Sequence, residues 1–174
     1  MTAEARSPAA HLADAMARTG SPDSVRLREL PYRYQLEVRG DPGGIERPEA
    51  GRATGDGPRY LLWLGPDWYL LVDDVPLSDV DGVDVSAQRT ILELSGPLAT
   101  AVLAHGCALD LHPRAFGPGS CAQTMLAKAQ VILHQTGTGP TYRIYVRASF
   151  TDYLVHWLLD AMVEYVAETA GADP

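Results

Sequence analysis

The segment 84–116 constrains the fold most, because it predicts a strand, a sharp turn and a short helix in immediate succession. The β-branched and apolar residues at 90–94 are typical of a strand. Pro97 follows almost directly, and proline is favoured at the first position of a helix, so Gly96 is the expected N-cap. Gly106 is expected to end this helix in a left-handed conformation.

Residues 107–116 then predict an irregular connection, which the apolar side chains of Leu109, Leu111 and Phe116 can hold in place. The turn at 95–97 has a second interpretation, as a helix N-terminus offered to a small anion. It lacks the glycine-rich or lysine-containing loop that binds phosphate, so the capping interpretation is favoured.

Alternating or continuous apolar residues bounded by turn residues predict further strands. These lie at 25–39, with a break or an edge strand at Pro31, at 59–72 as a hairpin around 65–67, at 123–128, at 131–135 and at 141–147. In the last strand, Tyr142, Ile144 and Val146 share one face and Arg143, Tyr145 and Arg147 the other.

Two stretches have no strand pattern. Residues 40–57 are rich in glycine, proline and charge, which indicates a flexible, solvent-exposed loop. Residues 73–84 carry several acids and could form one or two turns of helix.

Helical spacing appears at both ends of the chain. Residues 8–18, closed by Gly20, predict a short amphipathic helix that needs a surface to lie on, either in this chain or in a partner. The final helix begins near Ser149, with Asp152 at capping-box spacing, and carries a broad apolar stripe typical of core packing.

These elements predict an α+β fold: an antiparallel or mixed sheet with helices on one face, close to a duplicated ferredoxin-like arrangement. The predicted organisation is an N-terminal helical arm at 1–23, one domain at 24–170 that includes the loop 40–57, and a tail at 171–174.

The charge and cysteine content exclude several classes of function. With a formal charge of -8, the chain is a poor ligand for nucleic acid or for an anionic membrane surface. It has no apolar run of transmembrane length and no signal-peptide pattern, which predicts a soluble, cytoplasmic protein. Cys107 and Cys121 could form one disulfide, but two reduced, buried thiols are favoured.

No catalytic, cofactor-binding or metal-binding motif is present in the sequence. None of the five histidines has another ligand-type residue at metal-site spacing. Asp110 with His112 could form an acid–base pair, but we expect these side chains to hold their loop. Asp84 and Ser86 are expected to form a turn, and Cys107 has no evident base to activate it.

Several blocks resemble a known family when they are taken in order. They are LRELPYRYQLEVRGDPG at 27–43, LGPDWYLLV at 64–72, DVSAQRTILELSGPLATAVLAHGCALDLHPRAF at 84–116, CAQTMLAKAQVIL at 121–133 and YRIYVRASFTDYLVHWLLDA at 142–161. Together they resemble the gamma subunit of heterotetrameric sarcosine oxidase over 25–163.

This resemblance implies a fold similar to part of the glycine-cleavage aminomethyltransferase (T-protein). It implies a non-catalytic subunit that serves the assembly and stability of a flavoenzyme complex oxidising sarcosine or another secondary amine. The resemblance implies an alpha subunit with NAD and a tetrahydrofolate-binding region, a beta subunit with FAD, and a delta subunit with zinc. FMN would lie between the alpha and beta subunits. A free-standing folate-binding, one-carbon transfer protein is the alternative, and an anion-binding regulatory module at 95–97 is a third hypothesis.

An obligate subunit leaves apolar surface for its partners, and aromatic residues and arginine often dominate such interfaces. We therefore expect the loop 110–116 to contact the partner subunits, through Asp110, His112, Arg114 and Phe116. The alternative is that this loop folds onto the core of its own chain and Phe116 is buried there.

Overall fold

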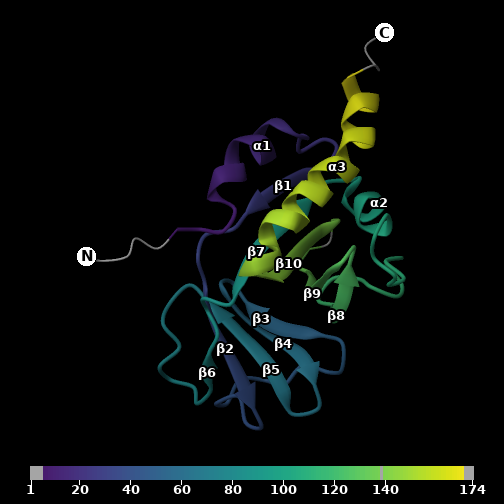
Figure 1. The fold of residues 1–174 in the computed structure, drawn as a ribbon. Coiled ribbons are helices and arrows are strands. Elements are labelled where there is room, and N and C mark those ends of the chain that lie inside the picture. The colour runs from purple at the N-terminus through teal and green to yellow at the C-terminus, as the bar shows by residue number, and fades with distance from the viewer. Residues whose placement is uncertain (1–5, 138, 171–174) are drawn as a thin grey trace, which may run out of the picture.

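The computed structural model describes residues 6–137 and 139–170, which form two five-stranded antiparallel sheets and three α-helices (Figure 1). The first sheet, called sheet 1 here, has the order β1-β7-β10-β9-β8. Its strands are β1 (Arg26–Glu29), β7 (Arg89–Ser95), β8 (Cys121–Leu126), β9 (Ala129–Gln135) and β10 (Thr141–Arg147).

Sheet 2 has the order β3-β4-β5-β2-β6. Its strands are β2 (Tyr34–Arg39), β3 (Ala53–Asp56), β4 (Arg59–Gly65), β5 (Trp68–Asp73) and β6 (Val83–Asp84). The helices are η1 (Ala10–Leu12), α1 (Ala13–Arg18), α2 (Ala99–Ala104), η2 (Ala148–Phe150) and α3 (Thr151–Ala170). No helix in the described ranges is long and apolar enough to cross a membrane.

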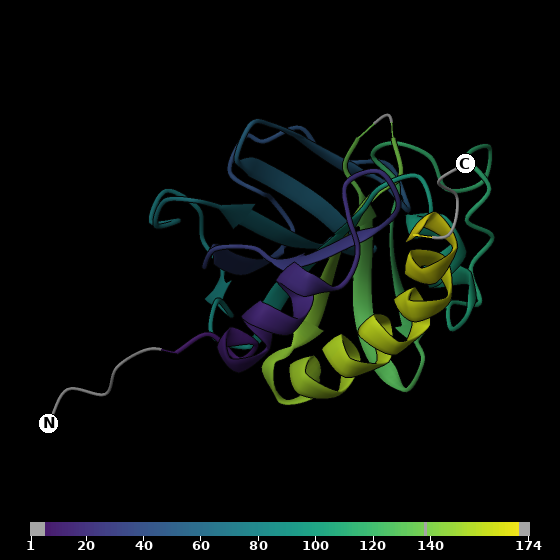
Figure 2. The same ribbon diagram turned by 90° about the horizontal axis from the view of Figure 1, so that it is seen from above.

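The molecule is layered, with α1 and α3 lying across one face of sheet 1 (Figure 2). The largest apolar cluster fills the space between these helices and sheet 1. A second cluster lies between the two sheets, and a third covers the far face of sheet 2 with side chains from 45–80. Both strands of the hairpin β4–β5 are therefore covered on both faces, as their continuous apolar sequence predicts.

The break at Pro31 moves the chain from one sheet to the other. β1 pairs with β7 in sheet 1, whereas β2 pairs with β5 in sheet 2. The chain stays in sheet 2 until β6 and returns to sheet 1 at β7. The α+β class is confirmed, but the strands form two antiparallel sheets where one was expected.

The connections differ from expectation in three places. Residues 53–56 of the predicted loop form β3, which pairs with β4. Residues 73–84 contain the short strand β6 in place of a helical turn. The helix α2 begins at Ala99, two residues after Pro97, because the N–H of Ala99 already bonds to the carbonyl of Gly96 in a turn.

Gly106 ends α2 for a reason other than a left-handed cap. Its φ is not positive, and an added Cβ would lie 2.6 Å from the ring of Trp157 on α3. The glycine is therefore required by the close approach of α3.

The predicted N-terminal helix packs on the core of this chain. Ala9, Leu12 and Met16 are buried in the cluster beneath the helices. The first five residues of the predicted arm and the tail at 171–174 lie outside the described residues.

The start of α3 also differs from expectation, because Asp152 does not close a capping box with Ser149. Its carboxylate lies 2.7 Å from Nε2 of His11. The buried stripe of α3 consists of Leu154, Val155, Leu158 and Met162, while Phe150 and Tyr153 are exposed.

Candidate functional site

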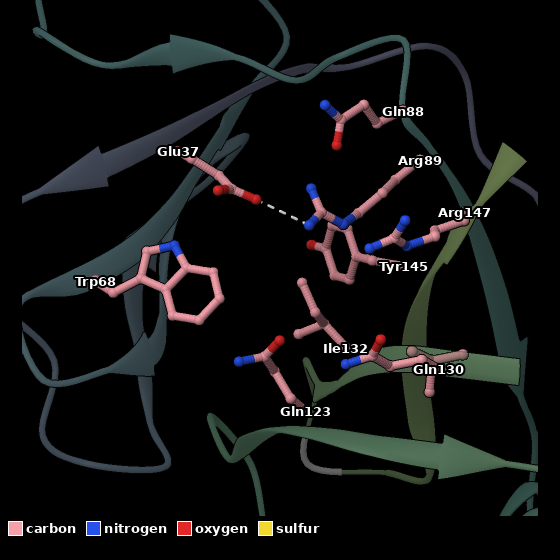
Figure 3. A pocket seen from close by; sticks show the side chains of 10 residues that line it. Glu37, Trp68, Gln88, Arg89, Gln123, Gln130, Ile132, Tyr145 and Arg147 are labelled. Atoms are coloured by element: carbon pink, nitrogen blue, oxygen red, sulfur yellow. Dashed lines mark hydrogen bonds and ion pairs between the residues drawn. The ribbon is translucent and has the colours of Figure 1, made fainter.

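A polar cleft of about 290 Å³ lies between the two sheets (Figure 3). Sheet 2 forms one wall through Glu37 on β2 and Trp68 on β5. Sheet 1 forms the opposite wall through the side chains of Arg89, Gln123, Gln130, Ile132, Tyr145 and Arg147, with Gln88 just before β7.

Cross-strand pairing explains why this wall is polar. Residues that lie directly opposite each other on antiparallel strands share a face of the sheet. Ile91, Tyr145 and Ile132 form one such row on the inner face of sheet 1, and they belong to the cluster between the sheets. Two positions along the strands, Arg89 on β7 lies directly opposite Arg147 on β10.

A second polar row lies on the other side of the apolar row. Glu93 on β7 lies opposite Arg28 on β1 and opposite Arg143 on β10, and Arg143 lies opposite His134 on β9. Glu93 accepts a hydrogen bond of 2.8 Å from Nε of Arg28. The guanidinium of Arg143 lies 4.9 Å from the centre of the Tyr60 ring.

Glu37 neutralises one of the two arginines of the cleft. Its Oε1 lies 2.9 Å from Nη2 of Arg89, and the two side chains are only 23% and 13% exposed. Arg147 is exposed and has no ion-pair partner within residues 6–137 and 139–170. The charged side chains of the cleft therefore leave one positive charge uncompensated.

Three donors of the cleft are buried without an acceptor in the described part of the chain: Nη1 of Arg89, Nε1 of Trp68 and the hydroxyl of Tyr145. Buried polar groups normally have hydrogen-bond partners, so three unpaired groups on one cleft require an explanation. Arg39 stacks at 4.2 Å over the Trp68 ring and orients this side chain without reaching its N–H.

Burial also sets the protonation states between the sheets. It raises the pKa of Tyr145 to about 12, against the opposing effect of Arg143, so this hydroxyl keeps its proton at neutral pH. Burial, assisted by Arg143, lowers the pKa of His134 to about 3, so this imidazole is neutral.

The predicted interface residues separate into two groups. Asp110, His112 and Arg114 are exposed, whereas Phe116 is 6% exposed and belongs to the cluster beneath the helices. The N–H of His112 donates to Asp110 Oδ1, and the N–H of Arg114 donates to His112 Nδ1. Asp110 and His112 therefore hold the loop, as expected, and Phe116 supports its own core and is not available as an anchor for a partner.

The other candidate groups have structural partners. Ser86 donates to Asp84 Oδ1, and its oxygen accepts the N–H of Gln35, so these residues form the expected turn. At the turn 95–97, the N–H of Gly96 bonds to Pro140 and that of Leu98 to Ser24. These donors are not available to an anion, which contradicts the third hypothesis.

The two cysteines are free and buried, which confirms the favoured interpretation over a disulfide. Burial raises the pKa of Cys121 to about 11. Within the described residues, no cluster of three His, Cys, Asp or Glu side chains could hold a metal ion.

No pattern in the sequence predicted the cleft itself, or the place of Glu37, Trp68 and Arg89 in its lining. A signal existed only for β10, where Tyr145 and Arg147 alternate with the core-facing residues. Their proximity to Glu37 and Trp68 depends on the packing of one sheet on the other, which no local pattern reveals.

Known proteins place the chain in a family. The sarcosine oxidase, gamma subunit family matches residues 39–164. The sarcosine oxidase subunit gamma of Corynebacterium sp. (strain P-1) is 41% identical over 96% of this chain and 94% of its own length. The protein of that name from Arthrobacter sp. is 39% identical over 95% of this chain and 94% of its own length. This chain belongs to the sarcosine oxidase gamma subunit family.

Solved structures agree with this assignment. A chain of the heterotetrameric sarcosine oxidase from Corynebacterium sp. U-96, in complex with pyrrole 2-carboxylate, superposes with a TM-score of 0.83. It is 39% identical and covers 93% of this gamma-family chain and 96% of its own.

The glycine cleavage system aminomethyltransferase T from Bartonella henselae has a TM-score of 0.59 at 14% identity and covers 85% of this chain, a likeness that shows the fold alone. Because this chain covers only 48% of that transferase, the expected similarity to part of the T-protein is confirmed, and a free-standing one-carbon transfer protein gains no support.

Proposed function

We propose that this chain is the gamma subunit of a heterotetrameric sarcosine oxidase-like flavoenzyme complex that oxidises sarcosine or another N-methyl or cyclic amino acid. Its role is the assembly and stability of that complex. The observation that carries the proposal is the TM-score of 0.83 over 93% of the chain with a component of such a heterotetramer.

The side chains support a non-catalytic role. The groups with catalytic potential already have structural partners: Asp110 and His112 hold a loop, and Asp84 and Ser86 hold a turn. The thiol of Cys121, with a pKa of about 11, is a poor nucleophile at neutral pH.

The partners would be the alpha, beta and delta subunits, and the cofactors of the complex would be bound there. In this proposal FAD, FMN, NAD, zinc and tetrahydrofolate belong to those subunits. The complex would be cytoplasmic.

Two exposed apolar side chains, Met125 and Phe150, line the same surface pocket, and apolar side chains that gather on a surface often mark an interaction site. Large apolar residues on the surface are Tyr32, Val75, Val83, Met125, Phe150, Tyr153 and Val163. We propose that the loop side chains of Asp110, His112 and Arg114 contribute polar contacts to this assembly.

Co-expression with the partner subunits tests the proposal. With the chain present, we expect a complex of four different subunits on size-exclusion chromatography, with bound flavin and secondary-amine oxidase activity. If the chain elutes alone, and its omission leaves the flavin content and activity of the partners unchanged, the proposal is wrong.

A substitution at the loop tests the contact surface separately. Arg114→Ala should weaken assembly and leave the melting temperature of the isolated chain nearly unchanged, because Arg114 is exposed. Arg26→Ala, at an exposed arginine on the edge strand β1, is the matched control. Normal assembly of Arg114→Ala would remove this loop from the interface.

A further inference from the structure

The cleft between the sheets contains buried hydrogen-bond donors that lack a partner. Arg89 Nη1, Trp68 Nε1 and the Tyr145 hydroxyl are buried and unpaired, and the one carboxylate of the cleft, Glu37, already accepts from Arg89 Nη2. A ligand that pairs with these three donors must supply hydrogen-bond acceptors.

The charges of the cleft also favour a ligand that is a hydrogen-bond acceptor, and in particular an anion. Arg89 and Arg147 lie directly opposite each other on neighbouring strands, where like charges are destabilising unless they are compensated. Glu37 compensates one of them, so one additional negative charge would make the cleft neutral.

The volume of the cleft limits the size of its ligand. A volume of about 290 Å³ is at the lower limit of typical small-molecule sites and accommodates a small organic molecule. Trp68 and Ile132 provide apolar wall beside the donors, and Tyr145 projects between the sheets (Figure 3).

We propose that this cleft is a binding site for a small organic carboxylate, which accepts hydrogen bonds from Arg89, Trp68 and Tyr145 and is paired with Arg147. A carboxylate has two oxygens that accept about four hydrogen bonds, which matches these donors. The carboxylate could be a free metabolite or the side chain of an acidic residue presented by a partner subunit. The chemistry is the same, and the experiment separates the two sources.

Trp68 provides a direct reporter, because its own indole N–H is one of the proposed donors. The chain contains three tryptophans, so the indole region of a ¹⁵N–¹H spectrum of the full-length chain contains three signals. Benzoate, added at constant ionic strength, should shift the Trp68 signal in a saturable manner and leave those of Trp63 and Trp157 nearly unchanged. Benzamide, of the same shape but uncharged, should give no saturable shift.

Substitutions connect the response to the cleft. Arg147→Gln should weaken benzoate binding roughly tenfold, since a hydrogen bond to a charged group contributes about 1.5 kcal/mol or more. Arg26→Gln, at an exposed arginine on the edge strand β1, should leave the binding unchanged. Because Arg147 is exposed, its replacement should not unfold the chain, and a normal spectrum of the variant checks this.

Assembly of the chain, labelled with 5-fluorotryptophan, with unlabelled partner subunits separates the two sources. A Trp68 fluorine signal that still responds to benzoate in the complex indicates a free metabolite. A signal that shifts on assembly and then does not respond to benzoate indicates an acidic side chain of a partner.

The proposal is overturned if the Trp68 signal of the free chain shows no saturable shift with benzoate, if benzamide gives the same shift, or if Arg147→Gln binds benzoate as tightly as the unaltered chain.

Discussion

The two phenylalanines of the chain show how strongly one residue type depends on its environment. Phe116 is 6% exposed in the cluster beneath the helices, whereas Phe150, just before α3, is 44% exposed. The same substitution at both positions therefore separates a core role from a surface role.

We expect Phe116→Ala to reduce the free energy of unfolding by about 3–5 kcal/mol, because it leaves a cavity in the core. Phe150→Ala should change it by less than about 0.5 kcal/mol. Urea denaturation of the isolated chain measures both values. Similar losses in the two variants would contradict the burial of Phe116 in its own core.

His134 should make the chain sensitive to mild acid. In the folded state its neighbours are the Tyr60 ring, Arg143 and Cys121, with no carboxylate among these contacts. Burial, assisted by Arg143, holds its pKa near 3. The unfolded chain, whose histidine has a pKa of about 6.5, takes up a proton that the folded state does not, so the free energy of unfolding falls as the pH drops below about 6.5.

This contribution is at most about 1.4 kcal/mol per pH unit for a single proton. His134→Gln should reduce the slope of unfolding free energy against pH between 6 and 4, measured by urea denaturation. His156→Gln, at an exposed histidine on α3, should leave the slope nearly unchanged. Equal slopes in the unaltered chain and in His134→Gln would show that His134 does not control this transition.

At the level of elements, α3 packs closely against Gly106, the glycine that follows α2. An added Cβ at Gly106 would lie 2.6 Å from Cζ2 of Trp157 and 3.1 Å from the backbone nitrogen of Ala127. The clash with the Trp157 ring must shift this side chain or α3, and the tight contact with the backbone nitrogen must shift the β8–β9 turn by a few tenths of an ångström.

Gly106→Ala should therefore lower the free energy of unfolding by about 1–3 kcal/mol, as overpacking does in other cores. Gly139→Ala is the matched control, because an added Cβ there has no neighbour within 4 Å. Thermal unfolding followed by circular dichroism compares the two variants. A stable Gly106→Ala chain would show that α3 is not held against this turn.

At the level of the whole molecule, the two free cysteines report on different layers. Cys107 belongs to the cluster beneath the helices, and Cys121 belongs to the cluster between the sheets. Cys121 also donates from Sγ to the carbonyl of Arg52, which connects β8 to the segment before β3.

Both thiols should be protected from a thiol reagent such as DTNB until the chain opens, and Cys121 in particular because of its burial and raised pKa. If the two layers unfold together, Cys107→Ser and Cys121→Ser variants should show equal labelling rates for the remaining thiol in dilute denaturant. Faster labelling of Cys121 would show that the sheets separate before the helices leave sheet 1.

Most of the local elements could be predicted from the sequence, because their signals lie within a few residues. The hairpin β4–β5, the break at Pro31 and the alternation along β10 follow from apolar periodicity and turn residues. The family assignment was also available from the ordered blocks, although each block alone has little specificity.

Other features could not be predicted from local patterns: these strands form two sheets, residues 53–56 pair with β4, and Gly106 faces Trp157. The cleft that Glu37, Trp68, Arg89 and Arg147 line belongs with them. Each of these features depends on contacts between segments far apart in the chain. The neighbours of a residue in sequence determine its preference for strand or helix. Which strands pair, and how one sheet packs on the other, depends on contacts across the whole molecule.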